Sequence, residues 1–188
     1  MSKKLSLLLA AAVLFAFAAP AFASAATGLT EGGALVLTAK PIKATNVGAF
    51  TTTSNQIGGI ACQSAVVKST LAVNKASEVK LVSGTGSATS CTGGSVKELT
   101  FSEIKTTGGG TGTFAVVYTV VLPSTAECHF STSAGTFTYF LTETAEGGDV
   151  ITISEQTLAV LPKACGTTAK LDGKFTLTTE AGTPTFLM

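Results

Sequence analysis

The chain of 188 residues contains no arginine and no tryptophan, and its only histidine is His129. Phosphate groups and nucleic acids favour the planar guanidinium fork of arginine, so the sequence argues against a nucleic-acid-binding protein. Without tryptophan, a flat aromatic platform for sugar rings would depend on Tyr118 and Tyr139, and both stand at positions that alternate inward. Sugar recognition through hydroxyl and amide groups stays open.

Charged residues are also scarce, at 12% of the chain. Removing residues 1–25 takes away two of the twelve lysines and leaves ten against eleven acidic residues, a net charge of about −1. The lysines stand singly, which is typical of solvated strand faces and not of a membrane-binding patch. Threonine and valine are abundant instead, and their β-branched side chains favour strands.

The amino terminus has the three parts of a secretory signal peptide. Lys3 and Lys4 precede an apolar run over 5–19, and Ala23-Ser24-Ala25 offers an A-x-A cleavage pattern. The run is shorter than the roughly 20 residues of a membrane-spanning helix, although a retained anchor is the alternative. No second apolar span follows, so we expect an exported chain, extracellular or at the cell surface, with no membrane span after cleavage.

The stretch 111–130 (TGTFAVVYTVVLPSTAECHF) organises the sequence. In its first part, the side chains at alternating positions are apolar, and most of the side chains at the positions between them are apolar as well. We therefore expect a central strand covered on both faces, which ends at Pro123 and Ser124.

Short strands with turn signals between them recur along the rest of the chain. A hairpin is expected around Ser54-Asn55, and Leu171, Phe175 and Leu177 alternate with polar residues in the clearest half-buried strand. This pattern predicts an all-β fold, an antiparallel β-sandwich or jelly roll. The expected organisation is a signal peptide (1–25), an amino-terminal segment that can supply a first strand (26–44) and a single sandwich domain (45–188).

Four cysteines form an even set in a chain expected to be exported, which favours two disulfides. Of the three possible connectivities we favour Cys62–Cys91 with Cys128–Cys165, because sequential pairing braces each half. Each such loop would remove roughly 3.5–4 kcal/mol of unfolded-state entropy. No C-x-x-C pair is present, which argues against a metal site built from the cysteines.

Catalytic signals are few. Any Ser-His-Asp or Cys-His site would have to use His129, and no G-x-S-x-G motif is present. Paired carboxylates of a glycoside hydrolase would come from five candidate glutamates: Glu98, Glu103, Glu127, Glu143 and Glu155. Solvated strand-face residues are the simpler interpretation of all of these.

One turn has the chemistry of a weak calcium site. Glu143, Glu146 and Asp149 surround Gly147-Gly148 and would supply hard oxygen ligands on a flexible turn. An ordinary exposed turn has the same composition. No other metal and no cofactor is expected.

Four short motifs resemble a known group of proteins: Gly59-Ile60-Ala61-Cys62, the Ser90–Gly94 turn, Cys128-His129-Phe130 and 171–178 (LDGKFTLT). They look like uncharacterised secreted four-cysteine, Thr/Gly-rich β-proteins of actinobacteria-like, high-GC Gram-positive bacteria. The resemblance implies export, disulfides and an all-β fold, and it assigns no functional residue.

Together these observations favour an exported non-catalytic β-domain with a binding, adhesion or cell-envelope role. Its partner would be an envelope polymer or another protein. The alternatives are a secreted hydrolase that uses carboxylates or His129, and a secreted protein inhibitor.

Overall fold

The computed structural model describes residues 28–75, 78–108, 110–140, 150–183 and 186–187. Within them the regular elements are β-strands and one short 3₁₀ helix, η1 (Lys163–Cys165). The strands are β1 (Leu29–Glu31), β2 (Ala34–Leu35), β3 (Pro41–Asn46), β4 (Phe50–Ser54), β5 (Gly58–Lys75), β6 (Glu78–Leu81), β7 (Gly84–Thr92), β8 (Ser95–Gly108), β9 (Thr111–Val121), β10 (Glu127–Phe140), β11 (Val150–Leu161), β12 (Thr168–Thr179) and β13 (Phe186–Leu187). The all-β prediction is confirmed.

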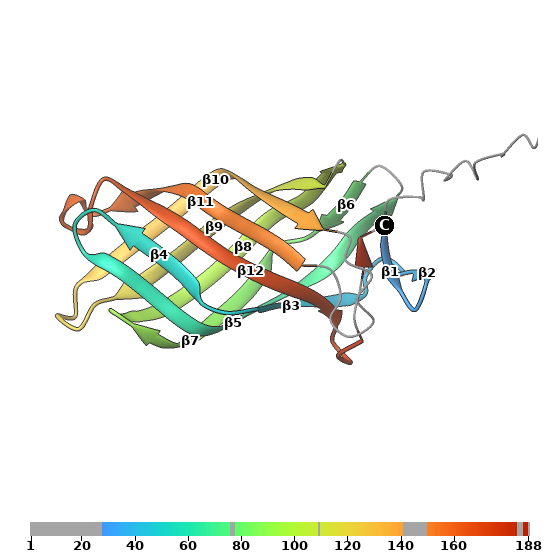
Figure 1. The fold of residues 1–188 in the computed structure, drawn as a ribbon, viewed down its shortest axis with the longest axis horizontal. Coiled ribbons are helices and arrows are strands. Elements are labelled where there is room, and N and C mark those ends of the chain that lie inside the picture. Colours follow the sequence, from blue (N-terminus) through green and yellow to red (C-terminus); the bar gives the residue numbers. More distant parts are fainter. Residues whose placement is uncertain (1–27, 76–77, 109, 141–149, 184–185, 188) are drawn as a thin grey trace, which may run out of the picture.

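Ten of these strands form one sheet that closes on itself (Figure 1). β3 and β4 share one position, since both pair with β5 and with β12. β6 and β7 share another, between β5 and β8. β11 pairs with β10 and also with β12, which joins the two ends of the strand order. Two of the positions therefore hold two strands each, and the ten strands occupy eight antiparallel positions.

The inner face of this closed sheet is the core. In β12, Leu171, Phe175 and Leu177 are buried while Lys170 and Lys174 are exposed, as the period of two requires. Opposite walls of the sheet pack against each other much as the two sheets of a sandwich do.

Aromatic rings make these contacts across the core. Phe50 of β4 lies against Tyr118 of β9, with ring centroids 6.1 Å apart. Phe101 of β8 lies 6.3 Å from Phe175 of β12.

The prediction that the central strand is covered on both faces is wrong. In β9, Phe114, Val116, Tyr118 and Val120 are buried on the inner face, but Val117 on the outer face is 55% exposed. A closed sheet has only one inner face, and the outer face of β9 is covered only in part, at Thr119, which is 6% exposed and hydrogen-bonded to His129. Small and β-branched residues on the outer face reflect their fit to a pleated surface, not burial.

The two ends of the closed sheet differ. The disulfide end carries Cys62–Cys91, which joins β5 to β7, and Cys128–Cys165, which joins β10 to η1. This is the predicted pairing, so it is confirmed. The opposite end carries the hairpin of β1 and β2, and we call it the hairpin end. There β1 and β2 form a small sheet with β13, beside β6 and the start of β3 (Figure 1).

Candidate functional site

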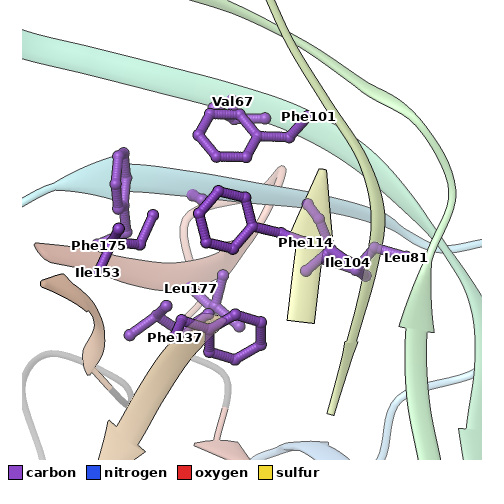
Figure 2. A pocket seen from close by; sticks show the side chains of 11 residues that line it. Val67, Leu81, Phe101, Ile104, Phe114, Phe137, Ile153, Phe175 and Leu177 are labelled. Atoms are coloured by element: carbon purple, nitrogen blue, oxygen red, sulfur yellow. The ribbon is translucent and has the colours of Figure 1, made fainter. Parts of the chain in front are cut away.

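An apolar cavity lies inside the closed sheet, in the half nearer the hairpin end. Its volume is about 50 Å³. Eleven side chains from all eight positions of the sheet line it, and all of them are hydrocarbon (Figure 2). They are Ala44, Val67, Leu81, Phe101, Ile104, Phe114, Phe137, Ile151, Ile153, Phe175 and Leu177.

Four phenylalanines from different strands form much of the wall. The ring of Phe114 lies 5.6 Å from that of Phe101 and 6.4 Å from that of Phe137. Phe175 adds a further edge-on contact with Phe101. Figure 2 shows these rings with Ile153 and Leu177 around one space.

Two glycines allow the rings to lie flat against the neighbouring strand. Phe137 pairs with Gly112 across β9 and β10, and Phe114 pairs with Gly135. A Cβ atom on Gly112 would lie 2.1 Å from the Phe137 ring, and one on Gly135 would lie 2.6 Å from the Phe114 ring. Only glycine, which has no Cβ atom, fits beneath either ring in its present position.

The hydrocarbon wall determines which guests this cavity can accept. Protein interiors are close-packed, with few voids larger than a water molecule. A water needs polar partners, and hydrocarbon walls offer none, so an apolar cavity stays dry and accepts apolar guests.

Tyr139 packs beside the cavity wall but is not one of the residues that line the cavity. It follows Phe137 on the inner face of β10, with ring centroids 6.4 Å apart, and its partner across the sheet is Ile151. The side chain is 4% exposed. Among the buried side-chain nitrogen and oxygen atoms of the described residues, the Tyr139 hydroxyl alone has no hydrogen-bond partner.

The hydroxyl of the other tyrosine has a hydrogen-bond partner. Tyr118, nearer the disulfide end, shares a hydrogen bond with the Thr52 hydroxyl and stacks on Phe130 at 5.1 Å. Burial raises the pKa of Tyr118 well above its ordinary value, and the hydrogen bond with Thr52 offsets part of that rise. Tyr118 is therefore a neutral structural residue.

The hairpin formed by β1 and β2 is held at its end of the sheet by one amide side chain. Asn74 of β5 accepts a hydrogen bond from the Leu29 nitrogen and donates to the carbonyl oxygens of Leu29 and Val36. Leu29 and Val36 are buried in the core, and Lys40 pairs with Glu31 beside them. Three hydrogen bonds thus depend on a single residue.

His129, the predicted candidate for acid–base chemistry, lies on the outer face. Its side chain is exposed, and Nδ1 lies 2.9 Å from the Thr119 hydroxyl on β9. Glu127, also exposed, accepts a hydrogen bond of 3.0 Å from Lys97. That bond, together with the charge of Lys97, lowers the pKa of the Glu127 carboxyl.

The structure does not gather the remaining glutamates. Glu98, Glu103 and Glu155 are exposed residues at irregularities of β8 and β11, each with a φ near +50°. Glu143, Glu146 and Asp149 lie outside the described residues. In the part of the chain that the structure covers, no three His, Cys, Asp or Glu side chains come together as a metal site would require.

Sequence reasoning found the inward alternation of the aromatic residues but not the cavity between them. A usable signal exists in the pairing of Phe114 and Phe137 with glycines on the facing strand. Reading that signal requires the register between β9 and β10, which the sequence does not state.

No family model, curated protein or solved structure matches the chain. The resemblance to secreted four-cysteine β-proteins therefore stays a prediction. The described residues include no helix with the length and apolar character needed to cross a membrane.

Proposed function

We propose that the chain is an exported binding domain whose closed sheet receives a small apolar ligand. The observation that carries this proposal is the cavity of about 50 Å³ with an entirely hydrocarbon wall. Two disulfides are compatible with an extracellular protein. Sequencing the amino terminus of the secreted protein tests the export part, with Ala26 as the expected first residue.

The size of the cavity limits the ligand. An apolar cavity of about 150 Å³ binds benzene, so one of about a third of that volume suits a group of a few heavy atoms. At a ceiling of about 1.5 kcal/mol per heavy atom, a ligand of about four atoms gains at most about 6 kcal/mol. The expected Kd is then tens of micromolar or weaker. A larger ligand would have to displace lining side chains.

Xenon is a suitable probe, because it is apolar and enters cavities of this kind. We expect dissolved xenon to shift the methyl NMR signals of the cavity wall, including those of Ile104, Ile153 and Leu177. Ala44→Val should reduce these shifts by filling the space, since Ala44 lines the cavity. Ala159→Val makes the same change at an exposed site on β11 and should leave them intact.

Absence of shifts at the wall in the folded protein would refute the proposed site. Equal xenon shifts in Ala44→Val and in the unaltered protein would do the same, because the guest would then lie elsewhere.

A further inference from the structure

We propose that a groove on the outer face of the closed sheet binds an acidic sugar, with the sugar carboxylate between Lys43 and Lys68. The groove has a volume of about 200 Å³ and is lined by residues of β3, β5 and β7 together with Glu180, just after β12. No residue lines both this groove and the apolar cavity. The inference is therefore independent of the function proposed for the cavity.

The two lysines of the groove stand directly opposite each other on neighbouring strands. Lys43 of β3 is the pairing partner of Lys68 of β5. Side chains at such positions have Cβ atoms about 4.5–5.5 Å apart, and like charges there destabilise the sheet. Only the strand register brings these lysines together, because they stand far apart in the sequence. An anion held between them would remove the repulsion.

A carboxylate of the chain itself already lies in this groove. Glu180 Oε1 is 3.6 Å from Lys68 Nζ, whereas Lys43 has no ion-pair partner among the described residues. The Lys68 and Glu180 side chains are 66% and 62% exposed, so their ion pair is weak. A ligand carboxylate between the two ammonium groups would meet two cations where Glu180 meets one, and it can take the place of Glu180.

The uncharged polar groups of the groove favour a sugar over a simple acid. Hydroxyls of Thr70, Ser83 and Thr85 line it, and a hydroxyl can both donate and accept a hydrogen bond, as sugar hydroxyls require. Thr85 pairs with Lys68 on the side away from Lys43, so a hydroxyl adjoins the charged pair. A cavity of about 150 Å³ holds benzene, so this groove has room for one six-membered ring.

A second lysine pair provides an internal control. Lys80 of β6 and Lys105 of β8 also face each other across the sheet, but neither lines the groove. Replacing Lys105 thus removes the same charge from the same kind of pair and leaves the groove intact.

The test compares glucuronate, glucose and acetate in NMR titrations of the backbone amides of the purified protein. Glucuronate has both the carboxylate and the hydroxyls, glucose lacks the charge, and acetate lacks the hydroxyls. We expect glucuronate to shift the amides of Lys43, Lys68 and Thr85 and to bind more tightly than acetate. Glucose should leave these amides unshifted.

Three variants assign the contacts. Lys43→Met should weaken glucuronate binding about 2- to 5-fold, the worth of one exposed ion pair. Glu180→Gln should tighten it by a similar factor, because the competing carboxylate is gone. Lys105→Met should bind glucuronate as the unaltered protein does. The replaced side chains are exposed or half-buried, so the three variants are expected to fold.

Several results would overturn the inference. One is the absence of glucuronate shifts at the groove. Another is glucose or acetate binding as tight as that of glucuronate, because the groove would then not recognise both the charge and the hydroxyls. Equal weakening in Lys43→Met and Lys105→Met would show general attraction to positive charge and no site. The xenon experiment on the cavity is unaffected by any of these results.

Discussion

The two ends of the closed sheet differ in how their buried polar groups are paired. At the disulfide end, Tyr118 is paired with Thr52, and the Ser54 hydroxyl donates to the Cys165 carbonyl oxygen. Both covalent links lie at this end. Towards the hairpin end the core contains a cavity and an unpaired tyrosine hydroxyl.

This difference shows which end of the molecule tolerates a cavity and an unpaired polar group in its core. A cavity and an unpaired polar group each lower stability, and consistency across all levels of structure is usually broken only at functional sites. Covalent bracing at one end offsets such losses at the other. The comparison predicts that substitutions at the disulfide end change stability, whereas those at the hairpin end change ligand binding and local opening.

The largest expected effect comes from removing the Cys128–Cys165 link. Replacing both cysteines by alanine should lower the free energy of unfolding by about 2–5 kcal/mol, measured by urea denaturation. Xenon shifts at the cavity wall should persist in the folded variant. Loss of those shifts would show that the two ends are not independent.

Asn74→Ala should open the hairpin end. It removes three hydrogen bonds to the backbone of Leu29 and Val36, with an expected cost of about 1–3 kcal/mol. Hydrogen exchange should become faster at the amides of Leu29 and Val36 while those of β9 stay protected.

Asn46→Ala provides the matched control. Asn46 also binds backbone groups through its amide, at Ala65 and Gln63, but not those of the hairpin. Hairpin exchange as fast in this variant as in Asn74→Ala would contradict the role assigned to Asn74.

The two tyrosines should respond in opposite directions to loss of the hydroxyl. Tyr118→Phe leaves the Thr52 hydroxyl buried without its partner and should cost about 1–2 kcal/mol. Tyr139→Phe removes an unpaired group and should leave stability unchanged or raise it. Thermal unfolding of the two variants side by side measures this, and a clear loss in Tyr139→Phe would mean that its hydroxyl has a partner.

The smallest effect concerns Glu127 on the outer face. Lys97 lowers the pKa of this carboxyl, first through a hydrogen bond and then through its charge. A lowered pKa in the folded state stabilises the protein above the unfolded pKa, and this contribution is lost as the pH falls through the folded value.

Lys97→Met should therefore raise the Glu127 pKa towards its ordinary value, as NMR titration of the carboxyl carbon would show. Because the pair is exposed, stability at neutral pH should hardly change. Lys105→Met, on the same strand, is the control and should leave the Glu127 pKa where it is.

Local pattern was enough to predict much of the fold. The alternation of Leu171, Phe175 and Leu177 gave the inner face of β12, and Ser54-Asn55 marked the hairpin of β4 and β5. The disulfide pairing followed from sequential bracing.

What could not be predicted depends on contacts between distant residues. Pairing of β11 and β12 with their neighbours closes the sheet, and no short motif records it. Three residues with a left-handed backbone conformation shift the inward–outward alternation inside long strands, and this hides the register. They are Glu98, Glu103 and Glu155. The cavity and the unpaired Tyr139 hydroxyl are results of that register, so they appear only in three dimensions.

Because β12 pairs with β3 and β4, the sheet closes only after residues 168–179 have been synthesised. Thr176 and Thr45, which face each other at the seam, are 131 positions apart. Before that moment the nascent chain has two open edges, at β3/β4 and at β11, and open edges pair readily with other chains. Translation that stops short of residue 168 would therefore leave these two edges open to pairing with another chain.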